Sequence, residues 1–508
     1  MTPKRTTAVA SLRQLERALD HAASYREWQD IADRIDAVSG AADWRASNDS
    51  ELLHVVEIQR SIATLRAMRE GGETWALMQK FQELLFRHQG EFTHPELYHR
   101  ARGGTLHVVG DFLDETEACL RYLLDVEVDG VSDTYRLEQV KRIGRVYGRP
   151  ALLLSGGALL GLYHFGVIKA LFEQDLLPRT ISGSSMGAIL ASWACCHTDD
   201  ELRALFADLS LINRNALERL PMREMLRQRT VMDQPKLLKF LGTIIPDLSF
   251  DESMRHSRRI LNVTVSPLNK LQTPRLLNYL SAPEALVHHA VLASCAMPLV
   301  FKPVQLMARH RGVVEPWMEN ELWVDGTVSG DLPFRQLTQM LNINHYITSQ
   351  ANPHIVPFMS MQRDRKGKLP ALARMGTNLS LRGSAEVLAV ARKHAPTRVL
   401  RDTLSTAHAI SNQTYAGSDM HVQLPFRPSL YAKVLRNPSY KEFLDYVRMG
   451  EQVTWPMIPM IRDRTRLSRS FGMAIGLLMQ RIESRAAGKE AAPNRTHGRK
   501  RARSARNG

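Results

Sequence analysis

Cysteine is scarce in this chain: four of its 508 residues are cysteines, Cys119, Cys195, Cys196 and Cys295. They are scattered, and they match neither the spacing of a zinc site nor that of a disulfide-stabilised secreted domain. We therefore expect buried thiols in a reducing compartment and no structural metal. The apolar fraction of 44% and the charged fraction of 23% are typical of a folded, soluble protein.

The chain also lacks a targeting segment and a long unbroken apolar run. Its first residues, MTPKRTTAVASLRQLERALDH, are basic but contain no apolar core of a secretory signal. The run PALLLSGGALLGLYHFGVI is about long enough to cross a bilayer. Clustered glycines and a serine divide it into a strand, a loop and a helix start. The sequence therefore predicts a cytoplasmic protein without a membrane span.

Acidic residues are too few to balance the basic ones, and the net charge is +15. From Arg481 onward, nine Lys or Arg face only Glu483 and Glu490. This segment has no apolar periodicity, which predicts a disordered tail over 481–508. A solvated tail is the simplest interpretation; contact with anionic lipid or with nucleic acid are the alternatives.

The patterns divide the rest of the chain into three regions. Residues 1–147 show apolar side chains at helical spacing, as in SYREWQDIADRID. Residues 148–350 alternate short apolar runs with helical patterns, which predicts an α/β domain with a largely parallel sheet. Residues 351–480 are mostly helical by composition. Strands are expected in ALLL, PRTIS, ILNVTVSP, ELWV and NHYITSQ.

The stretch ISGSSMGAIL places Ser185 between Gly183 and Gly187, after a strand and before a helix. Such a turn exposes a serine at a helix N-terminus, where free N–H groups favour a developing negative charge. Ser185 is therefore the candidate nucleophile. A serine that caps a helix is the structural alternative, and Ser182 or Ser184 could be the exposed hydroxyl instead.

A glycine-rich turn, SGGALLG, precedes this motif. Consecutive backbone N–H groups in such a turn suit a tetrahedral oxyanion, which makes Gly156, Gly157 and Ala158 the candidate oxyanion hole. The turn lacks the Lys-Ser/Thr of a phosphate-binding P-loop.

The candidate base is Asp325, which follows an apolar run and precedes Gly326. An ordinary Asp-Gly turn is the structural alternative. His345 and His354 leave a Ser–Asp–His triad open, because they follow Ser185 and Asp325 in the order of α/β-hydrolases. For His164 a packing or capping role is expected.

Four blocks in order, SGGALLGLYHFG, GSSMG, AVLASCAMPLVFKP and DGT, resemble the patatin-like phospholipase family over about residues 148–350. The resemblance implies a patatin-like, α/β-hydrolase-related sheet flanked by helices and a Ser–Asp dyad without histidine. Carried over to this chain, Ser185 is the nucleophile, Asp325 the base, and Gly156, Gly157 and Ala158 form the oxyanion hole.

The helical N-terminal region, with SYREWQDIADRID and HPELYHRARGGTLHVVGDFLDE, resembles the triacylglycerol-lipase branch of seeds, yeast and bacterial relatives, as do SQANPH and TWPMIP. In the glycine loop, Ser155, Ala158 and Leu160 replace the acid, third glycine and cation of plant patatins. The lost cation favours a neutral glyceride over a phospholipid. No histidine precedes an aspartate by five residues, which argues against an acyltransferase signature.

These features predict a serine lipid acyl hydrolase that needs no metal or organic cofactor and cleaves long-chain acyl esters, above all triacylglycerol. A phospholipase A or lysophospholipase with the same dyad is the alternative within the enzyme class. An inactive scaffold that binds membranes or nucleic acid is the alternative outside it. We expect a lipid substrate and a peripheral membrane or lipid-droplet surface as partners, and no nucleic acid. The apolar segments PMIPMI and FGMAIGLLM are expected in the core, with interfacial contact as the alternative.

Overall fold

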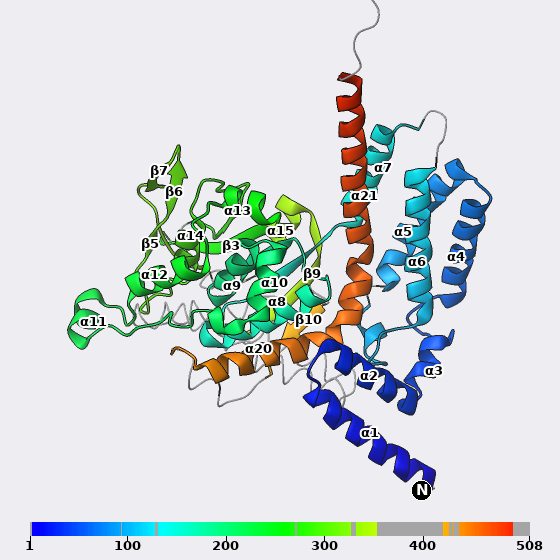
Figure 1. Ribbon diagram of the computed structural model, residues 1–508, viewed down its shortest axis with the longest axis horizontal. Helices are drawn as coiled ribbons and strands as arrows, with labels where there is room; N and C mark the ends of the chain where they lie inside the picture. The colour runs from blue at the N-terminus through cyan, green and yellow to red at the C-terminus, as the bar shows by residue number, and fades with distance from the viewer. Residues whose placement is uncertain are drawn as a thin grey trace, which may run out of the picture. The chain divides into compact units, whose positions relative to one another are not determined.

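The computed structural model describes residues 3–92, 94–126, 131–269, 272–326, 332–352, 420–425, 430 and 436–490. Its contacts divide the chain into two compact units. The first unit comprises residues 1–53, 91–107 and 149–465, and the second comprises 54–90, 108–148 and 466–508. Figure 1 shows the elements of both.

The first unit is built around a mixed β-sheet with the strand order β10-β9-β1-β2-β3-β8-β5, in which β4 also pairs with β3. Neighbouring strands from β10 to β3 run parallel, whereas β4 and β8 are antiparallel to β3 and β5 is antiparallel to β8. The strands are β1 (Arg149–Leu154), β2 (Thr180–Gly183), β3 (Ile260–Pro267), β4 (Arg275–Leu277), β5 (Val304–Gln305), β8 (Leu322–Asp325), β9 (Ile343–Gln350) and β10 (Met420–Gln423). A separate hairpin joins β6 (Met307–His310) to β7 (Val313–Pro316).

Helices cover both faces of the sheet, because successive side chains of a strand point to opposite sides. Leu152 and Leu154 of β1 belong to the main core, with α8, α9, α14 and α20. Ala151 and Leu153 pack in a smaller core with Leu337 of α15. The helices of this region are α8 (Tyr163–Glu173), α9 (Met186–Cys195), α10 (Asp199–Ala207), α11 (Met222–Gln228), α12 (Gln234–Ile244), α13 (Phe250–Ser257), α14 (Val287–Ser294), α15 (Phe334–Leu341) and α20 (Tyr440–Thr454), with short 3-10 turns η2 (Ala158–Leu162), η3 (Leu209–Leu211) and η5 (Trp455–Met457).

Three N-terminal helices and one 3-10 turn complete the first unit: α1 (Pro3–His21), α2 (Tyr25–Ser39), α3 (Ala41–Ala46) and η1 (Pro95–Tyr98). The buried carboxylate of Asp36 accepts hydrogen bonds from the backbone N–H groups of Arg102 and Gly103, at 2.7 and 2.8 Å. Arg448 of α20 donates to the carbonyl oxygens of Ala22 and Ala23. These contacts tie the helices to the rest of the unit.

The second unit is entirely helical in its described part. It contains α4 (Val55–Glu70), α5 (Thr74–Phe92), α6 (His107–Asp125), α7 (Asp133–Tyr147) and the part of α21 (Ile458–Glu490) that follows Thr465. Glu115 is buried and receives the guanidinium groups of Arg66 and Arg69, at 3.0 and 2.8 Å. Residues 481–490, expected in the tail, are instead the last turns of α21. Arg481 and Arg485 explain this, because they pair with Asp125 and Asp133.

The sheet and the flanking helices confirm the expected fold class. The strands expected in ALLL, PRTIS, ILNVTVSP, ELWV and NHYITSQ are present, but the sheet is mixed where a largely parallel one was expected. All four cysteines are free and buried, as expected. None of the helices in the described part of the chain is both long and apolar enough to cross a membrane.

Candidate active site

Ser185 lies on a tight turn between β2 and α9 and has φ 52° and ψ −122°. A positive φ costs a residue other than glycine roughly 1–2 kcal/mol, so the surrounding structure must impose it. The two motif glycines make the turn possible. A Cβ on Gly183 would lie 2.2 Å from the carbonyl oxygen of Gly187, and a Cβ on Gly187 would lie 2.2 Å from that of Leu154. The turn therefore packs backbone directly against backbone.

Exposure and hydrogen bonding distinguish Ser185 from its neighbours. Ser182 and Ser184 are fully buried, whereas Ser185 is half-buried. Ser185 occupies the N-cap position of α9, but its side chain makes no capping hydrogen bond. The hydroxyl oxygen of a serine that caps a helix accepts a hydrogen bond from a backbone N–H in the first turn. The hydroxyl of Ser185 therefore has the placement that a nucleophile needs.

The backbone of Ser185 is held by α14, a helix remote from it in sequence. The N–H of Ser185 donates to Ser294 Oγ at 3.0 Å, and that hydroxyl donates to the carbonyl oxygen of Thr264 at 2.8 Å. Ser294 is fully buried, and Thr264 lies in β3. The chain of contacts fixes the turn relative to the sheet.

Asp325 ends β8, and the register of the strands places it near the serine turn. Gly183 of β2 is paired with Val263 of β3, and Asp325 is paired with Val265, two residues farther along β3. Because β2 and β3 are parallel, both groups lie at the carboxyl end of these strands. The Asp325 side chain is fully buried, and its N–H donates to the carbonyl oxygen of Ala296 at 3.1 Å. A Cβ on Gly326 would lie 2.6 Å from the Thr264 carbonyl oxygen, which explains the glycine after Asp325.

Cys295 lies beside both candidate catalytic residues. Burial raises the pKa of its thiol far above the usual range, and the charge of Asp325 raises this pKa further, while a hydrogen bond with the Ser185 side chain lowers it. The thiol is therefore protonated at neutral pH. Cys295 therefore contacts the Ser185 side chain and lies within the electrostatic influence of Asp325.

The glycine loop follows β1 and is held by side chains from two sides. The hydroxyl of Ser155 donates to the carbonyl oxygen of Gly156 at 3.0 Å and accepts from the N–H of Ala351 at 2.8 Å. Ala158 has φ 46°, a left-handed conformation that favours glycine. A Cβ on Gly157 would meet Ala351 at 2.8 Å. Gly156, Gly157 and Ala158 thus form a strained, anchored turn at the carboxyl end of β1, next to β2.

His164 packs behind this loop in a fully buried position, which confirms its expected packing role. Its Nε2 lies 3.0 Å from the carbonyl oxygen of Ser155, and its Nδ1 lies 2.7 Å from Ser349 Oγ. Burial lowers the pKa of His164 to about 3, so the ring is neutral. Since a carbonyl oxygen only accepts, the proton sits on Nε2.

The triad alternative fails for His345. This residue is paired with Pro150, near the amino end of β1, whereas the serine turn lies beyond Leu154, at the carboxyl end. The four residue steps from Pro150 to Leu154 span roughly 13 Å along a strand. His345 therefore lies near the opposite end of the strands from Ser185. His354 lies outside the described residues.

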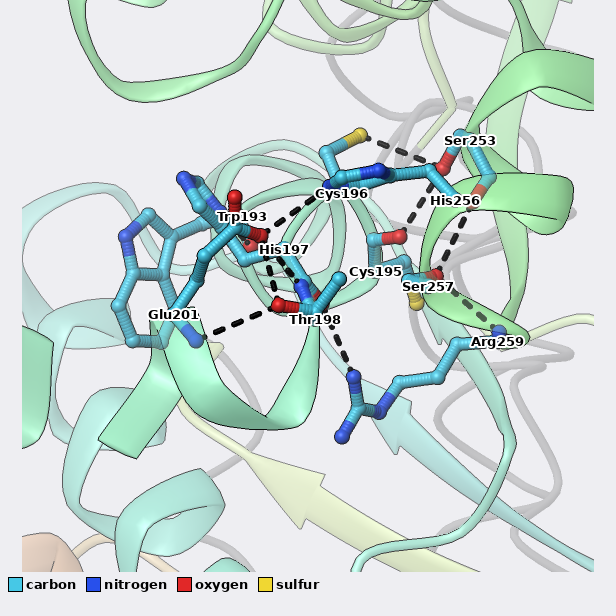
Figure 2. A network of polar contacts seen from close by, with 10 residues as sticks. All are labelled: Trp193, Cys195, Cys196, His197, Thr198, Glu201, Ser253, His256, Ser257 and Arg259. Carbon is cyan, nitrogen blue, oxygen red and sulfur yellow. Dashed lines mark hydrogen bonds and ion pairs between the residues drawn. The ribbon is translucent and has the colours of Figure 1, made fainter. Parts of the chain in front are cut away.

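The far end of α9, the helix that begins after Ser185, is anchored by the polar network in Figure 2. Ser253 Oγ donates to the carbonyl oxygen of Cys195 at 3.0 Å, and Arg259 donates to that of His197 at 3.0 Å. The ring of His197 bonds the carbonyl oxygen of Trp193 at 2.7 Å. Two of the last carbonyl groups of α9, those of Trp193 and Cys195, thereby have hydrogen-bond donors, which anchors the end of the helix.

Sequence reasoning missed Ser294 and Cys295. Both lie in the block AVLASCAMPLVFKP, but no spacing rule identifies residues that reach the site from another helix. Within the described residues, no group of three or more His, Cys, Asp or Glu side chains is arranged to hold a metal ion.

Comparison with known proteins gives two family matches. Residues 152–338 match the patatin-like phospholipase model, and residues 5–145 match a domain of unknown function, DUF3336. The first match contains the serine turn, the glycine loop and Asp325. The second covers the helices that precede β1.

Full-length relatives match most of the chain at 30% identity. Triacylglycerol lipase ptl3 of Schizosaccharomyces pombe matches over 93% of this chain and 99% of its own length. Triacylglycerol lipase 5 of Saccharomyces cerevisiae matches over 91% of this chain and 65% of its own length. Triacylglycerol lipase SDP1L of Arabidopsis thaliana matches over 90% and 57%. The chain thus spans nearly all of the first relative and less than two thirds of the other two.

Proposed function

Because this chain belongs to the patatin-like phospholipase family, and within it to the triacylglycerol-lipase branch, we propose that it is a serine lipid acyl hydrolase. The relatives' names suggest triacylglycerol as the substrate. The observation that carries the proposal is the turn at Ser185. This serine is strained and half-buried, and its hydroxyl makes no capping hydrogen bond to α9. The hydroxyl instead contacts the buried thiol of Cys295, whose pKa is also raised by the charge of Asp325.

In the proposed reaction, Ser185 Oγ attacks the ester carbonyl carbon while its proton passes to the Asp325 carboxylate. The carbonyl oxygen gains the negative charge, and the backbone N–H groups of Gly156, Gly157 and Ala158 stabilise it. When the tetrahedral intermediate collapses, the bond to the alcohol breaks and Asp325 returns the proton to the leaving oxygen. An acyl-enzyme remains.

Water then completes the cycle. Asp325 accepts a proton from the water that attacks the acyl carbonyl, and the second tetrahedral intermediate breaks the bond to Ser185 Oγ. The serine recovers its proton, and a fatty acid leaves. The positive end of α9, directly after Ser185, favours the negative charge in both steps.

The dyad is tested by labelling with a fluorophosphonate probe and by hydrolysis of p-nitrophenyl butyrate. We expect Ser185→Ala to abolish labelling and Asp325→Asn to reduce turnover by at least about 10⁴-fold, because the two groups act as a unit. Ser184→Ala is the matched control, since Ser184 is buried beside Ser185. Near-full activity of Asp325→Asn together with loss in His345→Asn would overturn the dyad. A wild-type protein that takes no label would identify an inactive scaffold.

The substrate is tested by fatty acid release from triolein emulsions and from phosphatidylcholine vesicles, with wild type and Ser185→Ala side by side. Faster release from triolein is expected. Release mainly from phosphatidylcholine would assign the chain as a phospholipase with the same residues. We further propose that the protein reaches its substrate at the surface of a membrane or lipid droplet.

A further inference from the structure

A short arm of the first unit, residues 219–231, carries α11 and exposes large apolar side chains. Figure 1 shows α11 standing apart from the sheet and the other helices of this unit. Met222 and Leu226 are 70% and 75% exposed. Because they are four residues apart, they lie on the same face of the helix. Val231, where the arm returns, is also exposed.

The same arm is basic. Its sequence, RLPMREMLRQRTV, contains four arginines and one acidic residue, Glu224. The arginines are all exposed: Arg219, Arg223, Arg227 and Arg229. Glu224 is paired with Arg227 at 2.8 Å, which leaves the arm with a net positive charge. Apolar side chains beside exposed arginines are typical of segments that lie on an anionic lipid surface.

Both ends of the arm are fixed to the body of the unit. Before the arm, the N–H of Leu217 donates to Asn437 Oδ1, and Asn437 Nδ2 donates back to the carbonyl oxygen of Leu217, both at 2.8 Å. At its end, the N–H of Met232 donates to the carbonyl oxygen of Val300 at 3.1 Å. The arm therefore has a rigid base.

That base contacts the segment that follows Cys295 in the candidate active site. Val300 follows Cys295, which contacts Ser185, by five residues, and the turn between them exposes Met297 and Leu299. Leu299 is 76% exposed and has φ 72°, an unfavourable conformation for a leucine. Its side chain is thus presented to solvent at a cost in backbone energy. The arm and this turn thus meet at Val300, five residues after Cys295.

From this geometry we infer that the arm and the turn, with Met222, Leu226 and Leu299 as apolar contacts and the four arginines as charged contacts, dock the protein on an anionic lipid surface. The docking brings Ser185 toward the layer that holds the acyl esters. The role of the docking, which is to bring Ser185 to its substrate, rests on the proposed function. The binding to lipid is independent of catalysis and can be measured without it. The exposed methionine and leucines favour lipid over nucleic acid, which would need the charge alone.

Vesicle sedimentation with the full chain carrying Ser185→Ala tests the surface without turnover. The vesicles are phosphatidylcholine alone or phosphatidylcholine with phosphatidylserine. We expect Met222→Ser/Leu226→Ser to weaken binding to both kinds of vesicle by roughly tenfold or more. Arg223→Gln/Arg227→Gln/Arg229→Gln should weaken binding to the anionic vesicles by roughly a hundredfold, since each basic residue near such a surface contributes a factor of about five.

Matched variants come from other exposed sites of the same unit. Leu280→Ser replaces a leucine that is 51% exposed, and Arg203→Gln/Arg255→Gln/Arg258→Gln removes the same charge. These controls should bind like the parent, and thermal melting shows that all variants are folded. Parental binding by the folded arm variants overturns the inference. So does a change in oligomeric state with unchanged vesicle binding, which would assign the arm to self-association. If the wild-type chain fails to hydrolyse esters while vesicle binding still depends on the arm, only the proposed function falls.

Discussion

At the scale of single residues, His164 is the side chain whose contacts suggest more than packing. Its Nε2–H holds the carbonyl oxygen of Ser155, and in a trans peptide the N–H of the next residue, Gly156, points the opposite way. His164 therefore sets the direction of an N–H in the candidate oxyanion hole. It acts as a positioning residue, since it does not reach the reacting atoms itself.

We expect His164→Leu to lower kcat for p-nitrophenyl butyrate by roughly 10–10³-fold with little change in KM, because oxyanion stabilisation belongs to the transition state. His164→Gln retains an N–H donor on a side chain of similar reach and should recover part of that loss. Equal activity of both variants, or a rise in KM alone, would contradict the positioning role.

The same residue makes stability depend on pH. Its pKa is about 3 in the folded protein and 6.5 as the ordinary value, so between these values the unfolded chain binds a proton that the folded chain does not. Stability from the neutral ring is complete above pH 6.5 and is lost as the pH falls toward 3. Between pH 3 and 6.5 the free energy of unfolding should therefore change with pH by up to about 1.4 kcal/mol per pH unit because of His164. In His164→Gln this contribution to the slope should be absent. Urea denaturation at several pH values measures it, and identical slopes would contradict it.

The candidate nucleophile and base could be predicted from the sequence because each lies in a recognisable local motif. Ser185 and Asp325 each stand at the end of an apolar run with a glycine beside them, and the structure places both near the carboxyl end of β3, which lies between β2 and β8. Ser294, Cys295 and the contact of His164 with Ser155 could not be predicted in this way. They depend on α14 and α8 packing against the sheet, which no local spacing encodes.

At the scale of elements, the packing of α8 against α20 depends on glycine. A Cβ on Gly450 would lie 2.0 Å from the carbonyl oxygen of Tyr163, which cannot move without disrupting α8. We expect Gly450→Ala to cost at least about 2 kcal/mol of the free energy of unfolding. The matched control is Gly242→Ala in α12, where nothing lies within 4 Å of the added Cβ. It should stabilise the protein by about 0.5–1 kcal/mol, because alanine favours a helix interior. Urea midpoints that move in the same direction for both variants would contradict this packing.

Elements with a strong apolar core were predictable, and short exposed ones were not. The strand expected in ILNVTVSP is β3 itself, buried along almost its whole length. In contrast, β7 is exposed at every position and β5 has only two residues, so neither has a recognisable alternation. The antiparallel direction of β8 is set by its pairing with β3, a long-range contact. That is why the sheet is mixed although its apolar strands suggested a parallel one.

The two apolar segments near the C-terminus differ in how far they are buried. In PMIPMI, the residues Ile458, Met460 and Ile461 are buried, as expected for core. In FGMAIGLLM, the buried residues Phe471, Ala474 and Leu478 alternate with the exposed Met473, Leu477 and Met479 at helical spacing. The second segment is one helix with two faces, and its composition alone could not separate them.

At the scale of the whole molecule, a large share of the net positive charge lies in the C-terminal residues 491–508. Residues 491–508 contain six Lys or Arg and no acid, so a chain that ends at Glu490 carries a net charge of +9 instead of +15. Glu490 is the appropriate truncation point, because Arg481 and Arg485 belong to α21 and are paired with acids of the second unit. A truncation at residue 480 would remove these ion pairs together with the tail.

Salt should therefore separate the charged and apolar parts of lipid binding. At low ionic strength we expect the chain that ends at Glu490 to bind phosphatidylserine-containing vesicles more weakly than the full chain, since each basic residue near such a surface contributes about 1 kcal/mol. At 1 M salt the screening length falls to about 3 Å, and the two chains should bind alike. The binding that remains is apolar and should depend on Met222 and Leu226, which salt does not screen. Sedimentation across a salt series checks this. Full-chain binding that is insensitive to salt, or a difference between the chains that persists at high salt, would show that the charge distribution does not govern association.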